Sequence, residues 1–234
     1  GSDGNQYVAA GARSGRFVCL NARGELVWER DLRGAIASTI SVSDFDSDGI
    51  ADILVVTQLG MLYRFDETGR VIWDIDTQGR SLAAGAIVDV DGDSALEYVL
   101  CTQNGNLLVF NQTGEITFNH QFSNRTINVT AAFGDIVKTR PGLEFAITGG
   151  ESGKVYCFGT AAPVNTAAPW RTYRRDNELT GCWSRLGSGA EARMTPANLA
   201  WDRILTGEDV VFHVSLPVPA GLAKAEATCT RPDG

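Results

Sequence analysis

Two short loops of the sequence hold acidic side chains at an identical spacing, 45 residues apart. The acids occupy positions one, three, five and nine of each loop: Asp44, Asp46, Asp48 and Asp52 in the first, and Asp89, Asp91, Asp93 and Glu97 in the second. Neighbouring carboxylates repel one another, so a compact loop of this kind needs a cation among them. Calcium binds six to eight oxygen atoms at roughly 2.3–2.6 Å, and the backbone carbonyls near position seven, those of Ile50 and Ala95, add to the carboxylates. The spacing therefore predicts two Ca²⁺ sites.

Other interpretations of these loops compete with calcium. Magnesium demands stricter octahedral geometry and keeps more of its water, so a flexible acid-rich loop favours the larger ion. A helix–loop–helix calcium site would need a glutamate at position twelve, where the first loop has Val55 in an apolar run. The remaining alternative is an acidic turn exposed to solvent, because aspartate and glycine are also common turn residues.

The residues after the loops repeat as well. Gly60 matches Gly105 and Trp73 matches Phe118, each pair 45 residues apart, and an earlier copy places Trp28 at the same position. The recurrence of the tryptophans at one position favours packing between neighbouring repeats over stacking on a sugar. A fourth copy contains "LEFAITGGESGKVYCFGT". Each copy alternates short apolar, β-branched or aromatic segments with turns that contain glycine, asparagine or aspartate, which is typical of β-strands. Four strands in about 45 residues is the period of one blade of a β-propeller.

The repeat predicts both the fold class and the domain organisation. We expect an all-β chain in which a β-propeller, with about four visible blades and the first incomplete, precedes a partial β-sandwich-like module. The expected boundaries are 1–183 for the propeller, 184–200 for a linker and 201–234 for the start of the second module, which we expect to be truncated. The first copy begins inside its first loop, which predicts that a strand and further blades lie upstream.

The second copy shows where the acidic loops belong in a blade. Its strands are expected over 36–43, 52–57, 61–66 and 70–75, which places the loop between the first and second strands. A calcium ion there would clamp one strand against the next, so its binding free energy would become folding free energy. The fourth copy keeps Asp135 and Glu144 but has Lys138 and Arg140 where the other acids stood. Either a side-chain cation replaces the metal in that copy, or the site is lost.

The charge balance of the chain argues against a nucleic-acid partner. The formal net charge is −8, which the eight acids of the two loops account for in full, so no basic field remains. No apolar run approaches the ~18 residues of a membrane-spanning helix, which predicts no membrane insertion. The first residues are not typical of an export signal, so we expect any such signal upstream.

The sequence offers no residue cluster typical of catalysis. Its histidines, His120 and His213, both lie in strand patterns and are predicted to be structural. No nucleophile, zinc or phosphate-loop motif is present, so we assign no catalytic residue. Three cysteines in strand-like runs are predicted to be buried, and the other two either pair or stay free: Cys19, Cys101 and Cys157, then Cys182 and Cys229.

The motifs DxDxDGxxD at 44–52 and DxDxDxxxE at 89–97 resemble the calcium-binding FG-GAP/VCBS-type propeller repeats. The unit at 60–73 is similar to the blades of pyrroloquinoline-quinone-type (PQQ-like) propellers. The stretch "PWRTYRRDNELTG" at 169–181 resembles a tail that often follows the last blade, and it either forms an aromatic-basic surface or packs against that blade. The resemblance implies an extracellular, periplasmic or cell-surface protein.

Three functional interpretations follow. The first is a non-enzymatic, calcium-stabilised propeller that binds a protein or carbohydrate ligand, or gives structural support, within a larger secreted or cell-surface protein. The alternative is part of a propeller enzyme, either a quinoprotein dehydrogenase or a calcium-dependent polysaccharide lyase. The third is an outer-membrane assembly scaffold. A repeat of this kind is specific for fold and weak for function, so the sequence alone names no ligand.

Overall fold

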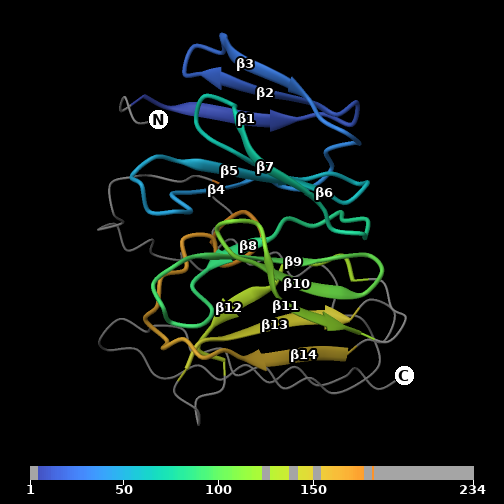
Figure 1. Ribbon diagram of the computed structural model, residues 1–234, viewed down its shortest axis with the longest axis vertical. Coiled ribbons are helices and arrows are strands. Elements are labelled where there is room, and N and C mark those ends of the chain that lie inside the picture. The colour runs from blue at the N-terminus through green and yellow to red at the C-terminus, as the bar shows by residue number, and fades with distance from the viewer. Residues whose placement is uncertain (1–4, 123–126, 137–141, 150–153, 177–180, 182–234) are drawn as a thin grey trace, which may run out of the picture. The chain divides into compact units, whose positions relative to one another are not determined.

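The computed structural model describes residues 5–122, 127–136, 142–149, 154–176 and 181 (Figure 1). These residues all belong to the first of two units, Gly1–Pro196 and Ala197–Gly234. The predicted linker at 184–200 and the predicted second module at 201–234 lie outside the described residues. No helix among the described residues is long and apolar enough to cross a membrane.

The described residues form four antiparallel sheets, each a simple meander of strands that are consecutive in the chain. The first sheet contains β1 (Tyr7–Gly11), β2 (Arg16–Asn21) and β3 (Leu26–Asp31); the second β4 (Ser41–Ser43), β5 (Asp52–Val56), β6 (Met61–Phe65) and β7 (Val71–Asp76); the third β8 (Ala86–Val88), β9 (Glu97–Cys101), β10 (Asn106–Phe110) and β11 (Ile116–Gln121); the fourth β12 (Ala132–Gly134), β13 (Glu144–Gly149) and β14 (Lys154–Gly159). The all-β propeller prediction is confirmed. In the second sheet the strands agree closely with those expected, except that β4 is much shorter than 36–43.

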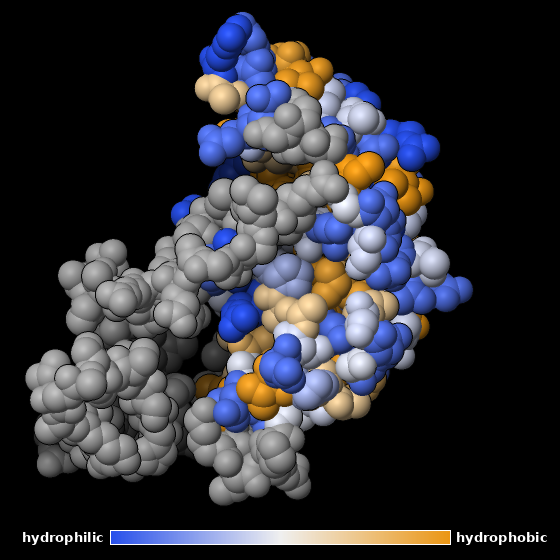
Figure 2. Space-filling view, turned by 90° about the vertical axis from the view of Figure 1, so that its left-hand side faces the viewer, coloured by the Kyte–Doolittle hydropathy of each residue, from blue (hydrophilic) through white to orange (hydrophobic). Residues whose placement is uncertain are grey.

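The sheets follow one another in chain order, as Figure 1 shows, and apolar side chains fill the space between neighbours. Every residue of β5, β6 and β9 is buried. These strands have neighbouring sheets on both faces, which explains their continuous apolar runs. The last strands of the second and third sheets, β7 and β11, are largely exposed. Figure 2 shows separate hydrophobic patches among hydrophilic areas on the face that it presents.

A repeated tryptophan joins each sheet to the next. The indole Nε1 of Trp28 donates a hydrogen bond to the carbonyl oxygen of Glu67 at 3.0 Å. Trp73 makes the same bond to the carbonyl oxygen of Gln112, also at 3.0 Å. Both acceptors lie in the turn before the last strand of the following sheet, so the two tryptophans pack between blades, as the repeat predicts. Phe118, the third residue in this series, is 47% exposed.

The contact of Trp28 with the next sheet requires a glycine at position 69. Gly69 has a φ of +77°, and a Cβ added there would lie 2.6 Å from Cδ2 of Trp28. Gly24 has a similar φ of +79° but open space around it. We expect Gly24→Ala to cost about 1–2 kcal/mol of unfolding free energy because of its left-handed backbone. Gly69→Ala should cost about 1–3 kcal/mol more, because the ring must also move. Urea unfolding of both variants measures the difference, and equal losses would contradict this account.

The described part of the tail, residues 169–176 and 181, packs on the first strands of two sheets. Trp170 pairs with Ile87 of β8 through two backbone hydrogen bonds, of 2.8 and 3.2 Å. Its side chain is 1% exposed and belongs to the core between the second and third sheets. The backbone N–H of Phe133 on β12 donates to the carbonyl oxygen of Arg171. The tail therefore contacts the third sheet as well as the fourth, and not the last blade alone.

One cysteine prediction is wrong. Cys19 and Cys101 are buried, as expected, but Cys157 is exposed. It lies on β14, which forms the edge of the fourth sheet among the described residues, so no neighbouring strand covers it. Cys182 and Cys229 lie outside the described residues.

Candidate metal sites in the acidic loops

Both acidic loops join the first strand of a four-stranded sheet to the second. The first loop connects β4 to β5 and the second connects β8 to β9, so the two lie at the same end of neighbouring sheets (Figure 1). We call this end the acidic end. The described residues contain two groups of three acids, one group in each loop, in which one carboxylate oxygen from each acid lies within 4.8 Å of those of the other two.

In the first loop this group consists of Asp44, Asp46 and Asp48. The backbone N–H of Gly49 donates to Oδ2 of Asp44 at 3.0 Å, and that of Ile50 donates to Oδ1 of Asp48 at 2.7 Å. Oδ1 of Asp44 is buried and has no hydrogen-bond partner. A buried carboxylate oxygen without a donor is costly, and a bound cation would remove that cost. Ile50 itself is exposed.

The fourth acid of the first loop points elsewhere. Asp52 is buried and accepts two hydrogen bonds from the guanidinium of Arg64, at 2.9 and 3.0 Å. A terminal nitrogen of Arg64 also binds Asp46, and the other reaches the carbonyl oxygen of Gln112 in the third sheet. Burial disfavours the guanidinium cation, but the hydrogen bonds that it donates to Asp52 and Asp46, together with the negative charge of these acids, outweigh burial and raise the pKa of Arg64. A side-chain cation thus already neutralises part of the first loop.

In the second loop the group consists of Asp89, Asp91 and Glu97. Asp89 is 2% exposed, and it accepts hydrogen bonds from the backbone N–H groups of Gly92 and Ser94 and from the hydroxyl of Thr166 in the tail. These donors hold the carboxylate of Asp89 in place.

Asp93, the remaining acid of the second loop, lies outside this group. Asp93 is exposed, and its Oδ1 accepts the backbone N–H of Ala95 at 2.7 Å. Asp93 is therefore not among the acids brought together by the fold, although its position in the loop predicts a ligand.

Glu97 differs from its counterpart Asp52 in that no cation among the described residues forms an ion pair with it. The position that matches Arg64 in the third sheet is Val109. Glu97 is 5% exposed, and its Oε2 accepts the backbone N–H of Val90 at 2.9 Å. Burial, together with repulsion from the nearby aspartates of the loop, raises the pKa of Glu97 from its ordinary value of 4.5 to about 7. In the part of the chain that the structure describes, the second cluster therefore lacks the side-chain cation that the first one has.

The last acid of each loop also has a structural role. Oδ2 of Asp52 accepts the backbone N–H of Phe45 at 3.0 Å, as Glu97 accepts that of Val90. Glu144 in the fourth sheet accepts the N–H of Ile136 at 2.8 Å. The same bond closes all three loops, which explains why the fourth copy keeps this acid. Lys138 and Arg140 lie outside the described residues.

The raised pKa of Glu97 predicts how the stability of the metal-free protein depends on pH. The folded state holds the Glu97 proton more tightly than the unfolded state, so this stabilisation is present below about pH 4.5 and is lost as the pH rises through about 7. The Glu97→Gln variant keeps a neutral side chain at every pH. In chelator, the melting temperature of the parent should fall relative to that of Glu97→Gln between pH 4.5 and 7, and the difference should then stay constant. A difference that does not change with pH would contradict the shifted pKa.

The sequence pattern did not identify three side chains that shape these loops. Arg64 contacts the first loop from β6, the side-chain Nε2 of Gln112 donates to the carbonyl oxygen of Phe45 in the same loop, and Thr166 reaches the second loop from the tail. Arg64 did leave a signal, because it is a charged residue at a position where the next copy has Val109. Thr166 lies 77 residues from its partner Asp89, and nothing in the sequence pattern links the two residues.

A profile of the lambda-carrageenase beta-propeller domain matches residues 7–135, which is more than half of the chain. The chain belongs to this family. The matched residues include both acidic loops. The more specific resemblance to calcium-binding FG-GAP/VCBS repeats stays a prediction. No curated protein matches the chain significantly.

Solved structures with a similar fold include BBS1N in complex with ARL6DN, which is 15% identical over 71% of this chain and 50% of that chain, with a TM-score of 0.54. Sqt1 of Saccharomyces cerevisiae is 21% identical over 68% of this chain and 42% of that chain, with a TM-score of 0.51. The chain thus spans about half the length of these structures or less. At such identities the likeness concerns the fold alone, and it agrees with the propeller arrangement of the four sheets.

Proposed function

We propose that this chain is the propeller part of an enzyme that acts on lambda-carrageenan or a related polysaccharide. The observation that carries this proposal is the family match over residues 7–135, which covers three of the four sheets and begins the fourth. The proposal corresponds to the propeller-enzyme interpretation, with a polysaccharide as substrate. A long polysaccharide does not cross a membrane unaided, so we also propose an extracellular, periplasmic or cell-surface location.

We propose Ca²⁺ as the ion of the acidic loops, with the second loop as the stronger site. An all-oxygen set of clustered carboxylates suits a hard cation. In the second loop, Asp89, Asp91 and Glu97 form no ion pair with any described residue, whereas Arg64 already pairs with Asp46 and Asp52 in the first. The backbone carbonyls of Ile50 and Ala95 remain proposed ligands. The role of the ion is to hold β8 against β9, and β4 against β5, so that the loops keep one conformation.

A non-enzymatic binding propeller is the second candidate. It is favoured by the fact that the clustered carboxylates of the described residues all lie in the two loops, where backbone N–H groups and Arg64 already engage them. His120 is exposed on β11 and packs edge-on against Phe122 and Phe158, with ring centroids 4.5 and 5.6 Å away. No acid–base pair suited to glycosidic bond cleavage is therefore assigned among the described residues.

Incubating the calcium-loaded chain with lambda-carrageenan tests these two candidates. The enzyme proposal expects new reducing ends and a fall in viscosity, and a lyase would also produce an unsaturated sugar that absorbs in the ultraviolet. Binding without new reducing ends would contradict the catalytic proposal and favour the binding propeller. Neither binding nor cleavage would contradict both.

A further inference from the structure

A polar pocket opens at the end of the sheets opposite the acidic loops. It has a volume of about 570 Å³ and is lined by Gln78, Gly79, Arg80, Gln103 and Asn104. In an antiparallel meander, alternate turns lie at opposite ends. The segment from β7 to β8 and the turn from β9 to β10 therefore share the end away from the acids, which we call the arginine end (Figure 1). We call the five lining residues the arginine–amide pocket.

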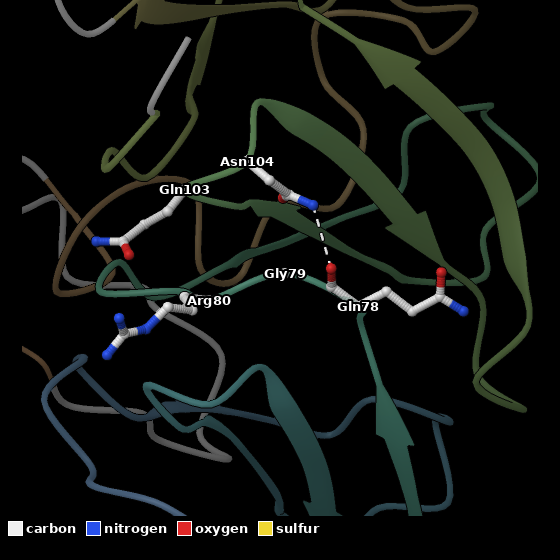
Figure 3. A pocket seen from close by; sticks show the side chains of 5 residues that line it. All are labelled: Gln78, Gly79, Arg80, Gln103 and Asn104. Atoms are coloured by element: carbon white, nitrogen blue, oxygen red, sulfur yellow. Dashed lines mark hydrogen bonds between the residues drawn. The ribbon is translucent and has the colours of Figure 1, made fainter. Parts of the chain in front are cut away.

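Backbone hydrogen bonds hold the two sides of this pocket together. The N–H of Gln103 donates to the carbonyl oxygen of Arg80 at 2.7 Å, and the side-chain amide of Asn104 donates to the carbonyl oxygen of Gln78 at 3.1 Å. A Cβ on Gly79 would lie 2.3 Å from Oδ1 of Asn104, so only glycine allows this close approach. In Figure 3 the side chains of Arg80 and Gln103 extend in the same direction from neighbouring segments. The guanidinium of Arg80 and the amide of Gln103 therefore lie on neighbouring segments that a backbone hydrogen bond joins.

The charges of the chain are separated between the two ends of the sheets. In the first three sheets the connections at the arginine end are residues 12–15, 32–40, 57–60, 77–85 and 102–105, and they contain Arg13, Arg33 and Arg80 but no acidic residue. The residues between β13 and β14, 150–153, include Glu151 and lie outside the described part of the chain. The nearest acids there are Asp31 and Asp76, which end β3 and β7. The opposite end carries both acid clusters. Of the two ends of these three sheets, the arginine end is therefore the more favourable one for an anionic polymer.

The amide of the pocket recurs in the preceding sheet. Gln58 and Gln103 occupy matching turns 45 residues apart, and the N–H of Gln58 donates to the carbonyl oxygen of Ala35 as that of Gln103 does to Arg80. Both glutamines are half-buried, and neither side-chain amide has a hydrogen-bond partner within the described part of the chain. The Nε of Arg80 lies 3.4 Å from the carbonyl oxygen of Gln58. Free amides repeated on adjacent sheets suit a ligand that itself repeats.

We propose that the arginine–amide pocket binds an anionic polysaccharide, with Arg80 engaging an acidic substituent and Gln103 a hydroxyl group. This inference rests on the proposed function and assigns its substrate to one end of the propeller. A guanidinium binds sulfate or carboxylate oxygens with charge-assisted hydrogen bonds, and an amide offers both a donor and an acceptor to hydroxyls. Arg33 and Gln58 extend the same chemistry towards the first sheet.

Binding of the full chain to lambda-carrageenan, a sulfated polysaccharide, tests this proposal by titration calorimetry in calcium-containing buffer. Arg80→Gln should weaken binding about 10-fold or more, and Gln103→Ala about 2- to 10-fold. The matched control is Arg23→Gln, which removes the same charge from an exposed turn at the acidic end and should bind like the parent. Thermal unfolding of each variant confirms that it is folded.

The outcomes separate this proposal from the proposed function. Parent binding that all three variants retain would overturn the pocket and leave the proposed function in place. Equal binding to neutral dextran, to single-stranded DNA or to inorganic sulfate alone would overturn the assignment to an anionic polysaccharide. If the parent did not bind lambda-carrageenan, the proposed role of the pocket would be overturned. The reducing-end assay described above would still test the proposed function separately. Selective loss in Arg80→Gln and Gln103→Ala supports the proposal.

Discussion

Replacing Arg64 with methionine is expected to lower the free energy of unfolding by about 3–5 kcal/mol, since it breaks a buried ion pair and leaves a charge uncompensated. The side chains of Arg64 and Asp52 are only 4% and 6% exposed. Asp46 loses its partner in the same step, and the link from Arg64 to the carbonyl oxygen of Gln112 in the third sheet disappears. Urea unfolding followed by tryptophan fluorescence measures the loss.

The matched control for Arg64 is Arg16, which also makes two hydrogen bonds to one carboxylate, that of Glu29. The Arg16 side chain is 56% exposed, so solvent screens the pair and Arg16→Met should change stability very little. If Arg64→Met and Arg16→Met lost similar amounts of unfolding free energy, burial would not be the reason why the Arg64 pair stabilises the fold. Added calcium should stabilise Arg64→Met more than the parent, because Asp46 and Asp52 become available to the metal.

Calcium added to the metal-free protein is expected to raise the melting temperature, because an ion that binds only the folded state stabilises it by mass action. At a calcium concentration 100 times the Kd this amounts to about 2.7 kcal/mol. Asp91→Asn should remove most of the response, since Asp91 belongs to the second cluster. Asp46→Asn should remove less, because Arg64 already neutralises Asp46 in the first loop.

Asp93→Asn is the control for Asp91→Asn. It makes the same change two residues away in the same loop, but Asp93 lies outside the group of close carboxylates. An asparagine at position 93 can still accept the N–H of Ala95. We expect this variant to keep most of the calcium response. A melting temperature that calcium leaves unchanged in the parent would contradict the metal sites, and equal losses in Asp91→Asn and Asp93→Asn would show that spacing in the sequence, not the observed grouping, selects the ligands.

Much of the fold was predictable because its signal is local and repeated. The 45-residue period, the glycine-containing turns and the short apolar segments depend only on neighbouring residues, and the strands from β5 to β7 appear close to where they were expected. The packing role of Trp28 and Trp73 followed from their recurrence. The exposed thiol of Cys157 was not predictable, because strand composition does not reveal whether a further strand lies alongside.

The sequence by itself determined the propeller fold and the position of the acidic loops between the first and second strands. The fold decided which acids of each loop lie together, because Asp48 belongs to its group whereas Asp93 does not. Only the tertiary structure decided what balances their charge. The β5–β6 register places Arg64 opposite Leu54, two residues from Asp52 on the same face, and the β9–β10 register places Val109 in the same relation to Glu97. Two loops of identical spacing therefore have different electrostatics. The reason is physical: spacing sets which carboxylates are near one another along the chain, whereas strand pairing and burial set which charges they meet across it.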